Sequence, residues 1–164
     1  MRSTDLKFTK EIRFPGSAEV VAAMLSDKAF RERVAQEAGA ASYSVLVEET
    51  ADGVRSVIDT SQPTDGLPGV AAKFLGSTFD IHQEEVWSSA TSGRLTVSIP
   101  GKPGTVNGTV SLTEQGEETV QTVDAVIKVG IPLVGGKVET IIGSALGRVL
   151  KVQQRVGAEW LAEG

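Results

Sequence analysis

The last thirty or so residues, 132–162, have the periodicity of one long amphipathic helix. At about 100° per residue, the apolar positions fall within about 60° of a single line. They are Val138, Ile141, Ile142, Ala145, Val149, Val152, Val156 and Trp160. The opposite side carries Lys137, Ser144, Arg148, Lys151, Gln154 and Arg155. Such a helix would extend roughly 45 Å, so it must lie across a broad surface that the rest of the chain has to supply.

The preceding chain has the pattern of an antiparallel sheet. Leu6 to Phe14 alternates between apolar and polar residues, which predicts a half-buried strand. Two short helices are predicted next, at 18–25 and from Ser26 or Asp27 to Ala38. The period is then two for almost ninety residues, with the Asp52-Gly53 pair as a strong hairpin signal. The six strands expected there lie near residues 43–50, 54–60, 78–87, 95–99, 105–114 and 120–129.

Two stretches interrupt this strand pattern. Residues 67–76 contain Pro and Gly and are too irregular for a strand, so we expect a loop with at most one helical turn. Asn107-Gly108 falls inside a strand whose alternation resumes with Val110, and this favours a bulge.

The whole order predicts an α+β fold in which seven antiparallel strands present one apolar face. That face must be covered, and the terminal helix is the only element large enough to cover it. A chain of 164 residues with 40% hydrophobic and 23% charged residues is expected to form a single domain, 1–164, around one core.

Composition excludes several classes of function. A net charge of −5 disfavours nucleic acid as the partner, because Lys and Arg dominate binding to phosphates. The absence of cysteine excludes disulfides, thiol catalysis and thiolate metal sites. The polar start and the lack of any run of about 18 apolar residues predict a cytoplasmic protein without stable membrane insertion. The sequence leaves the oligomeric state open.

Three segments, together with the order of elements, resemble the helix-grip proteins of the START, Bet v 1 and polyketide cyclase superfamily. They are Gly16 to Asp27, Leu67 to Gly76 and Ile131 to Glu139. The last two are similar to an uncharacterised bacterial branch of that superfamily. The resemblance implies a curved sheet wrapped around the long helix with a cavity between them. Members bind sterols, lipids, polyketides, hormones or quinones, and some catalyse cyclisation or hydrolysis, so the resemblance does not select one function.

The first hypothesis is therefore a protein that binds or carries a hydrophobic small molecule, lipid, sterol-like or polyketide-like, beneath the terminal helix. Small and medium apolar side chains on the helix and sheet would leave the interior partly unfilled, although a tightly packed interior is the alternative. Residues 67–76 would either gate this cavity or plug one end of the core. The predicted cavity residues are Phe74, Phe79, Trp87, Val97, Val110, Val123, Ala125, Ile127, Val138, Ile142, Ala145 and Val149.

The alternatives are an enzyme of the cyclase or hydrolase type and a protein-interaction module. An enzyme would draw its acid or base from His82, Tyr43 or a buried carboxylate. His82 lies beside Asp80 and Glu84, but alternation with Phe79 and Ile81 predicts that it faces solvent.

Other polar residues give weaker signals. Arg94 and Asp124 are possible polar anchors of unknown orientation. Residues 130–137 only faintly match a phosphate-binding loop, and a helix entry explains them better. No metal site, cofactor or catalytic residue is predicted.

Overall fold

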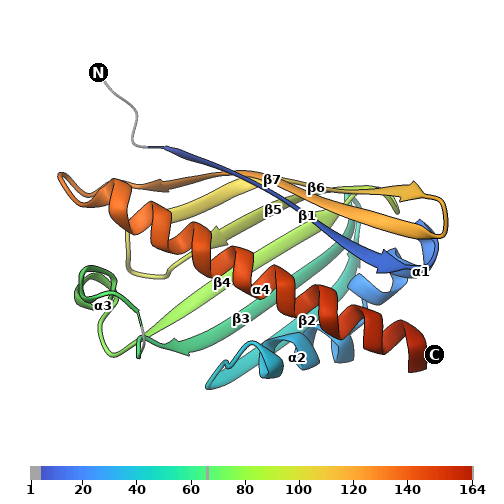
Figure 1. Ribbon diagram of the computed structural model, residues 1–164, viewed down its shortest axis with the longest axis horizontal. Coiled ribbons are helices and arrows are strands. Elements are labelled where there is room, and N and C mark those ends of the chain that lie inside the picture. Colours follow the sequence, from blue (N-terminus) through green and yellow to red (C-terminus); the bar gives the residue numbers. More distant parts are fainter. Residues whose placement is uncertain (1–4, 66, 164) are drawn as a thin grey trace.

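The computed structural model describes residues 5–65 and 67–163, and its frame is one sheet of seven antiparallel strands (Figure 1). The strands lie in the order β1-β7-β6-β5-β4-β3-β2. Strands β2 to β7 are therefore a simple meander, and β1 pairs with the last strand, β7. Their bounds are β1 Leu6–Pro15, β2 Ser42–Thr50, β3 Gly53–Pro63, β4 Thr78–Trp87, β5 Ser92–Ser98, β6 Gly104–Gln115 and β7 Glu118–Val129.

Two short helices carry the chain from one edge of the sheet to the other, because β1 and β2 are the two edge strands. Helix α1 (Ala18–Leu25) begins after Ser17, whose side chain accepts a hydrogen bond from the Val20 amide at 3.2 Å. Helix α2 (Lys28–Glu37) begins after Asp27, whose carboxylate accepts from the Ala29 amide at 2.9 Å. Both predicted caps are confirmed, since a side-chain oxygen satisfies an amide that the helix leaves free.

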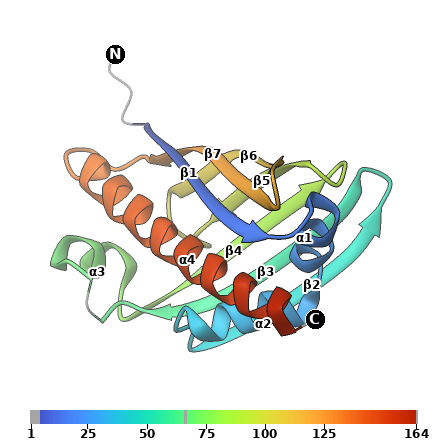
Figure 2. The same ribbon diagram turned by 45° about the vertical axis from the view of Figure 1, so that its right-hand side comes forward.

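The long helix α4 (Gly135–Glu163) crosses the concave face of the sheet (Figures 1 and 2). Its apolar stripe is buried or half-buried, as predicted. Residues beside the stripe are buried as well, including Glu139, Gly143, Gln153 and Gly157. The sheet and α2 together enclose more of the helix than one apolar stripe covers, which explains why glycines and polar residues are buried beside it.

The entry to α4 begins three residues later than the pattern predicted. Pro132 lies in a turn in which the Gly135 amide donates to the Ile131 carbonyl at 3.0 Å. Leu133 has a positive φ of 72° in this turn and is fully exposed. The buried Glu139 carboxylate then accepts a hydrogen bond from the Val129 amide at 2.8 Å, which fixes the helix start to the end of β7.

Two local predictions are wrong. Residues 69–75 form a seven-residue helix, α3 (Gly69–Leu75), rather than a loop with at most one turn, because Ala71 and Leu75 are buried against Ile99. Asn107-Gly108 is not a bulge, since both residues pair in unbroken register with β5 and β7. Gly108 is required instead by close approach: a Cβ there would lie 2.1 Å from the Asp124 carbonyl oxygen.

Candidate functional site

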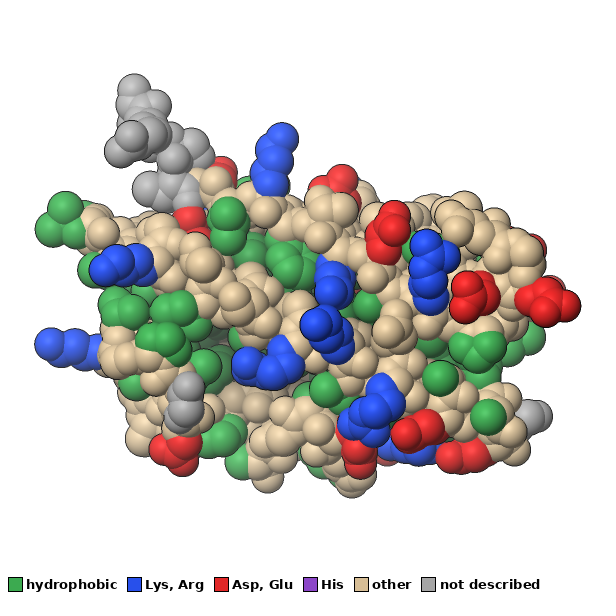
Figure 3. All heavy atoms as spheres, viewed as in Figure 1, with side chains coloured by type: hydrophobic (Ala, Val, Ile, Leu, Met, Phe, Trp, Pro, Cys, Tyr) green, Lys and Arg blue, Asp and Glu red, His purple; other side chains and the backbone are tan. Residues whose placement is uncertain are grey.

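A cavity of about 320 Å³ lies between α4 and the sheet. Its walls come from α2, from β3 to β6 and from one side of α4, and Figure 3 shows the surface hollowed between α3 and α4. Most of the lining is aliphatic or aromatic. The apolar lining residues include Val34, Ile58, Phe79, Ile81, Val97, Ile99, Val106, Ile141, Ile142, Ala145, Leu146, Val149 and Val152.

The structure brings five of the twelve predicted cavity residues to this space: Phe79, Val97, Ile142, Ala145 and Val149. The other seven lie elsewhere. Trp87, Val110, Val123, Ala125 and Ile127 are buried in the main core. Val138 is buried at the start of α4. Phe74 belongs to α3 and packs against the cluster of Ala71, Leu75 and Ile99, with the Lys102 ammonium 5.9 Å from its ring centre.

The separation has a physical cause in how β1 and β7 meet the helix. Gly143 and Gly157 let the side chains of these strands approach α4 closely: a Cβ on Gly157 would lie 2.3 Å from Phe14, and one on Gly143 would lie 3.4 Å from Ile127. This part of the interface is filled by apolar side chains. Towards β3, β4 and β5 the helix presents Ala145, Val149 and Val152, and the space between them and the sheet stays open.

One end of the cavity is polar. Arg31 of α2 lines it, and the Arg31 guanidinium Nη2 donates to Glu85 Oε1 on β4 at 2.7 Å. The two side chains are only 2% and 4% exposed. The Arg31 Nε atom also donates to the Leu25 carbonyl at the end of α1, at 2.7 Å. Arg31 therefore joins α1, α2 and β4 at one buried point.

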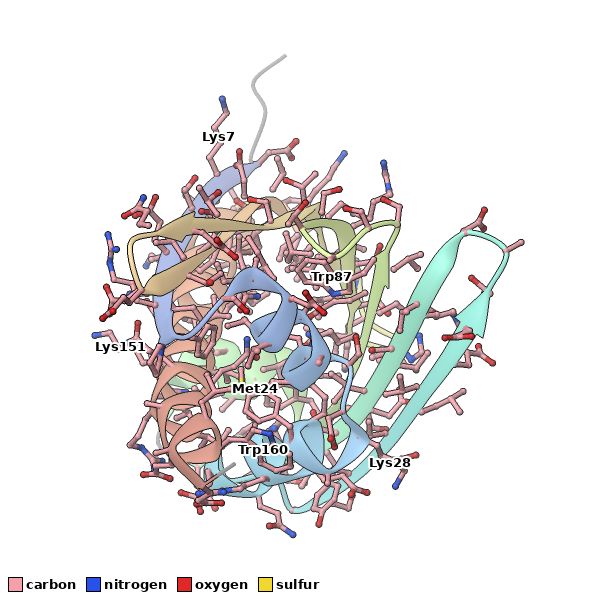
Figure 4. The ribbon with its side chains drawn as sticks, turned by 90° about the vertical axis from the view of Figure 1, so that its right-hand side faces the viewer. Lys7, Met24, Lys28, Trp87, Lys151 and Trp160 are labelled. Carbon is pink, nitrogen blue, oxygen red and sulfur yellow. The ribbon has the colours of Figure 1, made fainter. Side chains whose placement is uncertain are left out.

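A set of buried amides and an indole completes this polar end. Gln153 Oε1 accepts from Arg31 Nη1 at 3.4 Å, and the Gln153 amide nitrogen donates to Gln121 at 3.0 Å. Glu85 also accepts from the Trp87 indole at 2.9 Å and from the Gln83 amide at 2.8 Å. Figure 4 shows Trp87 inside the molecule, while Lys7, Lys28 and Lys151 point outwards. Each carboxylate oxygen of Glu85 thus has a donor, which a buried charge requires.

The sequence alone did not predict this polar end, although the strand pattern indicated one of its two charged residues. Glu85 shares the inward register of Phe79, Ile81 and Trp87 on β4, so alternation alone placed a carboxylate in the interior. Arg31 gave no comparable signal. It follows Phe30 in a short helix of low mean hydropathy, and only the packing of α2 on α4 shows that both are buried.

The mouth of the cavity lies between α2, α3 and α4. Glu37 and Arg148 stand there and are exposed, and Leu67 and Leu75 from the 67–76 segment contribute to the lining. Glu37 is paired with Arg155 at 3.0 Å. Helix α3 thus borders the opening as well as packing on Ile99, so its geometry fits both a gate and a plug.

His82 lies on the outer face of the sheet and is not among the residues lining the cavity in the described part of the chain. Its Nδ1 is 2.6 Å from Asp59 Oδ1 and its Nε2 is 3.1 Å from Glu84 Oε1; Asp59 thus takes the place expected for Asp80. These two hydrogen bonds, Asp59 first, raise the pKa of His82 above its ordinary value. The hydrogen bonds from Arg55 and then His82 lower the pKa of Glu84.

The remaining polar candidates lie outside the cavity. Tyr43 is hydrogen-bonded to Gln36, and Arg94 and Asp124 are exposed on the outer face. Within residues 5–65 and 67–163, no group of three or more His, Asp or Glu side chains is arranged to hold a metal ion. In the same residues, no helix is both long and apolar enough to cross a membrane.

Comparison with solved structures shows the fold. The protein TTHA0849 from Thermus thermophilus superimposes with a TM-score of 0.65 at 18% identity, covering 93% of this chain and 97% of that one. A START superfamily protein from Mycobacterium smegmatis gives a TM-score of 0.63 at 17% identity, covering 94% and 98%. The di-domain ARO/CYC BexL from the BE-7585A biosynthetic pathway gives 0.66 at 14% identity, covering 95% of this chain and 50% of that one. At these identities the likeness supports a START-type helix-grip fold and nothing finer.

Sequence comparison finds relatives in mycobacteria. The uncharacterized proteins Rv0481c of Mycobacterium tuberculosis and Mb0491c of Mycobacterium bovis are each 31% identical over 101 residues, which is 58% of this chain. The match also spans 58% of the length of these relatives. The profile of the family described as "Protein of unknown function (DUF2505)" matches residues 9–161, nearly the whole chain. The chain therefore belongs to the DUF2505 family and has the helix-grip fold of the START superfamily.

Proposed function

We propose that this protein binds and carries a small hydrophobic molecule in the cavity beneath α4. The observation that carries the proposal is the cavity itself, about 320 Å³ with a mainly apolar lining that reaches exposed residues at its mouth. Interiors normally pack densely, so an unfilled apolar space of this size requires an explanation. A ligand that fills it supplies one.

The driving force would be burial of apolar surface, at about 25 cal/mol per Å² removed from water. The volume is near the lower end of the range of roughly 300–1,000 Å³ for small-molecule sites. Among the lipid, sterol-like and polyketide-like classes, this size favours a compact molecule of one or two fused rings or a short chain. Two proteins that share this fold, BexL and StfQ, are ARO/CYC proteins of biosynthetic pathways, so we keep the polyketide-like class among the proposed ligands.

The enzyme alternative has less support, because the groups that would provide acid or base catalysis are placed unfavourably. His82 and Tyr43 are not among the described residues that line the cavity, and the Glu85 carboxylate is occupied by Arg31, Trp87 and Gln83. We therefore propose binding without catalysis, with a small molecule as the partner. For the location we propose the cytoplasm, as the sequence predicts.

Native mass spectrometry of the purified protein, before and after incubation with lipid and aromatic extracts, tests the proposal directly. We expect retained molecules of low mass and displacement of a fluorescent apolar dye by them. Failure to retain any apolar molecule and to bind any dye would overturn the proposal.

A pair of tryptophan variants localises the binding. Val149→Trp should fill the cavity and abolish dye binding, because Val149 lines it. Val126→Trp is the matched control, since Val126 lies exposed on the outer face of β7 and the larger side chain stays in solvent. Equal dye affinity in both variants, with unchanged circular dichroism, would exclude this cavity as the site.

A further inference from the structure

The polar end of the cavity has donors that the protein itself does not use. A guanidinium carries five N–H bonds. Three of these donate within the described residues, to the Leu25 carbonyl, to Glu85 and to Gln153. Two N–H bonds of Arg31 therefore have no hydrogen-bond acceptor in the part of the chain that the structure describes. Arg31 is 2% exposed and lines the cavity, so bulk solvent does not serve these donors freely.

One of the three existing bonds is weak. The Arg31 Nη1 to Gln153 Oε1 distance is 3.4 Å, against 2.7 Å for Nη2 to Glu85. Ordinary N–H···O bonds fall at about 2.7–3.2 Å. A ligand oxygen beside Nη1 would therefore form a second hydrogen bond there or replace the weak one to Gln153.

Charge decides what kind of oxygen this end accepts. Arg31 borders the cavity, whereas Glu85 is not among its lining residues and lies behind the guanidinium. The two charges already cancel each other. A ligand carboxylate would leave the buried group with an excess negative charge, which is strongly unfavourable without a further partner. A neutral carbonyl or hydroxyl oxygen accepts the free N–H bonds without that penalty.

We propose that Arg31 is the polar anchor of the ligand site and that the ligand is an apolar molecule bearing a neutral carbonyl or hydroxyl oxygen. This inference rests on the proposed function and adds the chemical class of the ligand. The oxygen binds at the α2 end of the cavity, against Arg31, and the hydrocarbon body lies along Val97, Ala145 and Val149. Gln83 also lines the cavity, but its amide nitrogen already donates to Glu85.

Three naphthalenes of nearly equal shape test the proposal: 2-acetylnaphthalene, its alkene isostere 2-isopropenylnaphthalene, and 2-naphthoate. The ketone should bind at least about tenfold more tightly than the alkene, because a hydrogen bond from a charged donor is stronger than one between neutral groups. The carboxylate should bind more weakly than the ketone. Equal affinity for the ketone and the alkene, or preference for the carboxylate, would overturn the anchor while leaving the hydrophobic carrier intact. If none of the three binds, the anchor proposal fails, and dye binding and native mass spectrometry then decide separately whether the proposed function fails as well.

Infrared spectroscopy of the wild-type protein gives a test that needs no variant. The carbonyl stretch of bound, ¹³C-labelled 2-acetylnaphthalene should lie at a lower frequency than in hexane, because a hydrogen bond weakens the C=O bond. A bound frequency equal to that in hexane would show an oxygen without a donor and would overturn the proposal.

Two variants separate the anchor from the apolar wall. Arg31→Met should reduce the ketone-to-alkene affinity ratio to near one and return the carbonyl frequency to its hexane value. Val149→Ala should change the affinities for both probes by a similar factor and leave their ratio intact. A ratio that survives Arg31→Met in a folded protein would assign the donor to another residue.

Discussion

The space beneath α4 has a packed half and an open half, and the two are built from different side chains. Near β1 and β7 the helix carries glycine, and Phe14, Ile127 and Met24 come close to it. Near β3, β4 and β5 the helix carries Ala145 and Val149, and the cavity remains between them and the sheet. The same helix thus acts as a core element on one side and as a wall on the other. The difference suggests that the packed half provides most of the stability, which leaves the open half free to serve binding.

Truncating one apolar side chain in each half should give the largest difference in stability between the two halves. Phe14→Ala removes a fully buried ring and should destabilise the protein by about 3–5 kcal/mol, because the rigid surroundings leave a cavity. Val149→Ala should cost about 1 kcal/mol or less, since the Val149 methyls already border empty space and lose few contacts. Urea unfolding measures both. Equal costs would mean that the open half is as well packed as the other.

The buried ion pair lies at the boundary of the two halves and should show strong coupling. Arg31→Met or Glu85→Met alone should cost about 3–5 kcal/mol, because each leaves a buried charge without its partner. The double variant Arg31→Met/Glu85→Met should lose clearly less than the sum. A double-mutant cycle by chemical denaturation measures this coupling. Strict additivity would show that the two side chains do not depend on each other.

Alanine substitutions at two glycines of α4 should change stability by smaller amounts and in opposite directions. Gly157→Ala should destabilise by about 1–3 kcal/mol, because the new Cβ would lie 2.3 Å from Phe14. Gly147→Ala should stabilise by up to about 1 kcal/mol through helix propensity, since its nearest neighbour, Phe8, would be 4.0 Å from the Cβ. Thermal unfolding of the pair gives both signs. Stabilisation by Gly157→Ala would show that the Phe14 ring can move to make room for the new methyl group.

The smallest effect is expected on the outer face. The pKa of His82 should exceed 6.5, and Asp59→Asn should lower it, because the hydrogen bond to Asp59 is the largest cause of the shift. A raised folded-state pKa gives a stabilisation that is fully present below about pH 6.5 and is lost as the pH rises through the folded value. For so exposed a pair this should be below about 1 kcal/mol. An NMR titration of the His82 ring measures the pKa, with Asp80→Asn as the control that leaves it unchanged.

The sequence was informative about elements and uninformative about where they leave space. The strand patterns, the caps at Ser17 and Asp27 and the outward position of His82 follow from local periodicity, and the structure has them. The predicted cavity residues were all apolar positions facing inwards, but inward direction does not distinguish a wall from packed core. Trp87 and Ile127 face inwards and are buried in the main core, whereas Val97 and Val149 border the cavity.

By itself, the sequence determined the seven strands and the helix that covers them, because alternation and amphipathic periodicity are properties of neighbouring residues. The pairing of β1 with β7 joins distant segments and came from the tertiary structure. Only the tertiary structure decided where the interior is filled and where it is hollow. Packing depends on the sizes of side chains from distant segments, such as Phe14 against Gly157. The same is true of the buried pair of Arg31 and Glu85, which are 54 residues apart and meet only in the folded protein.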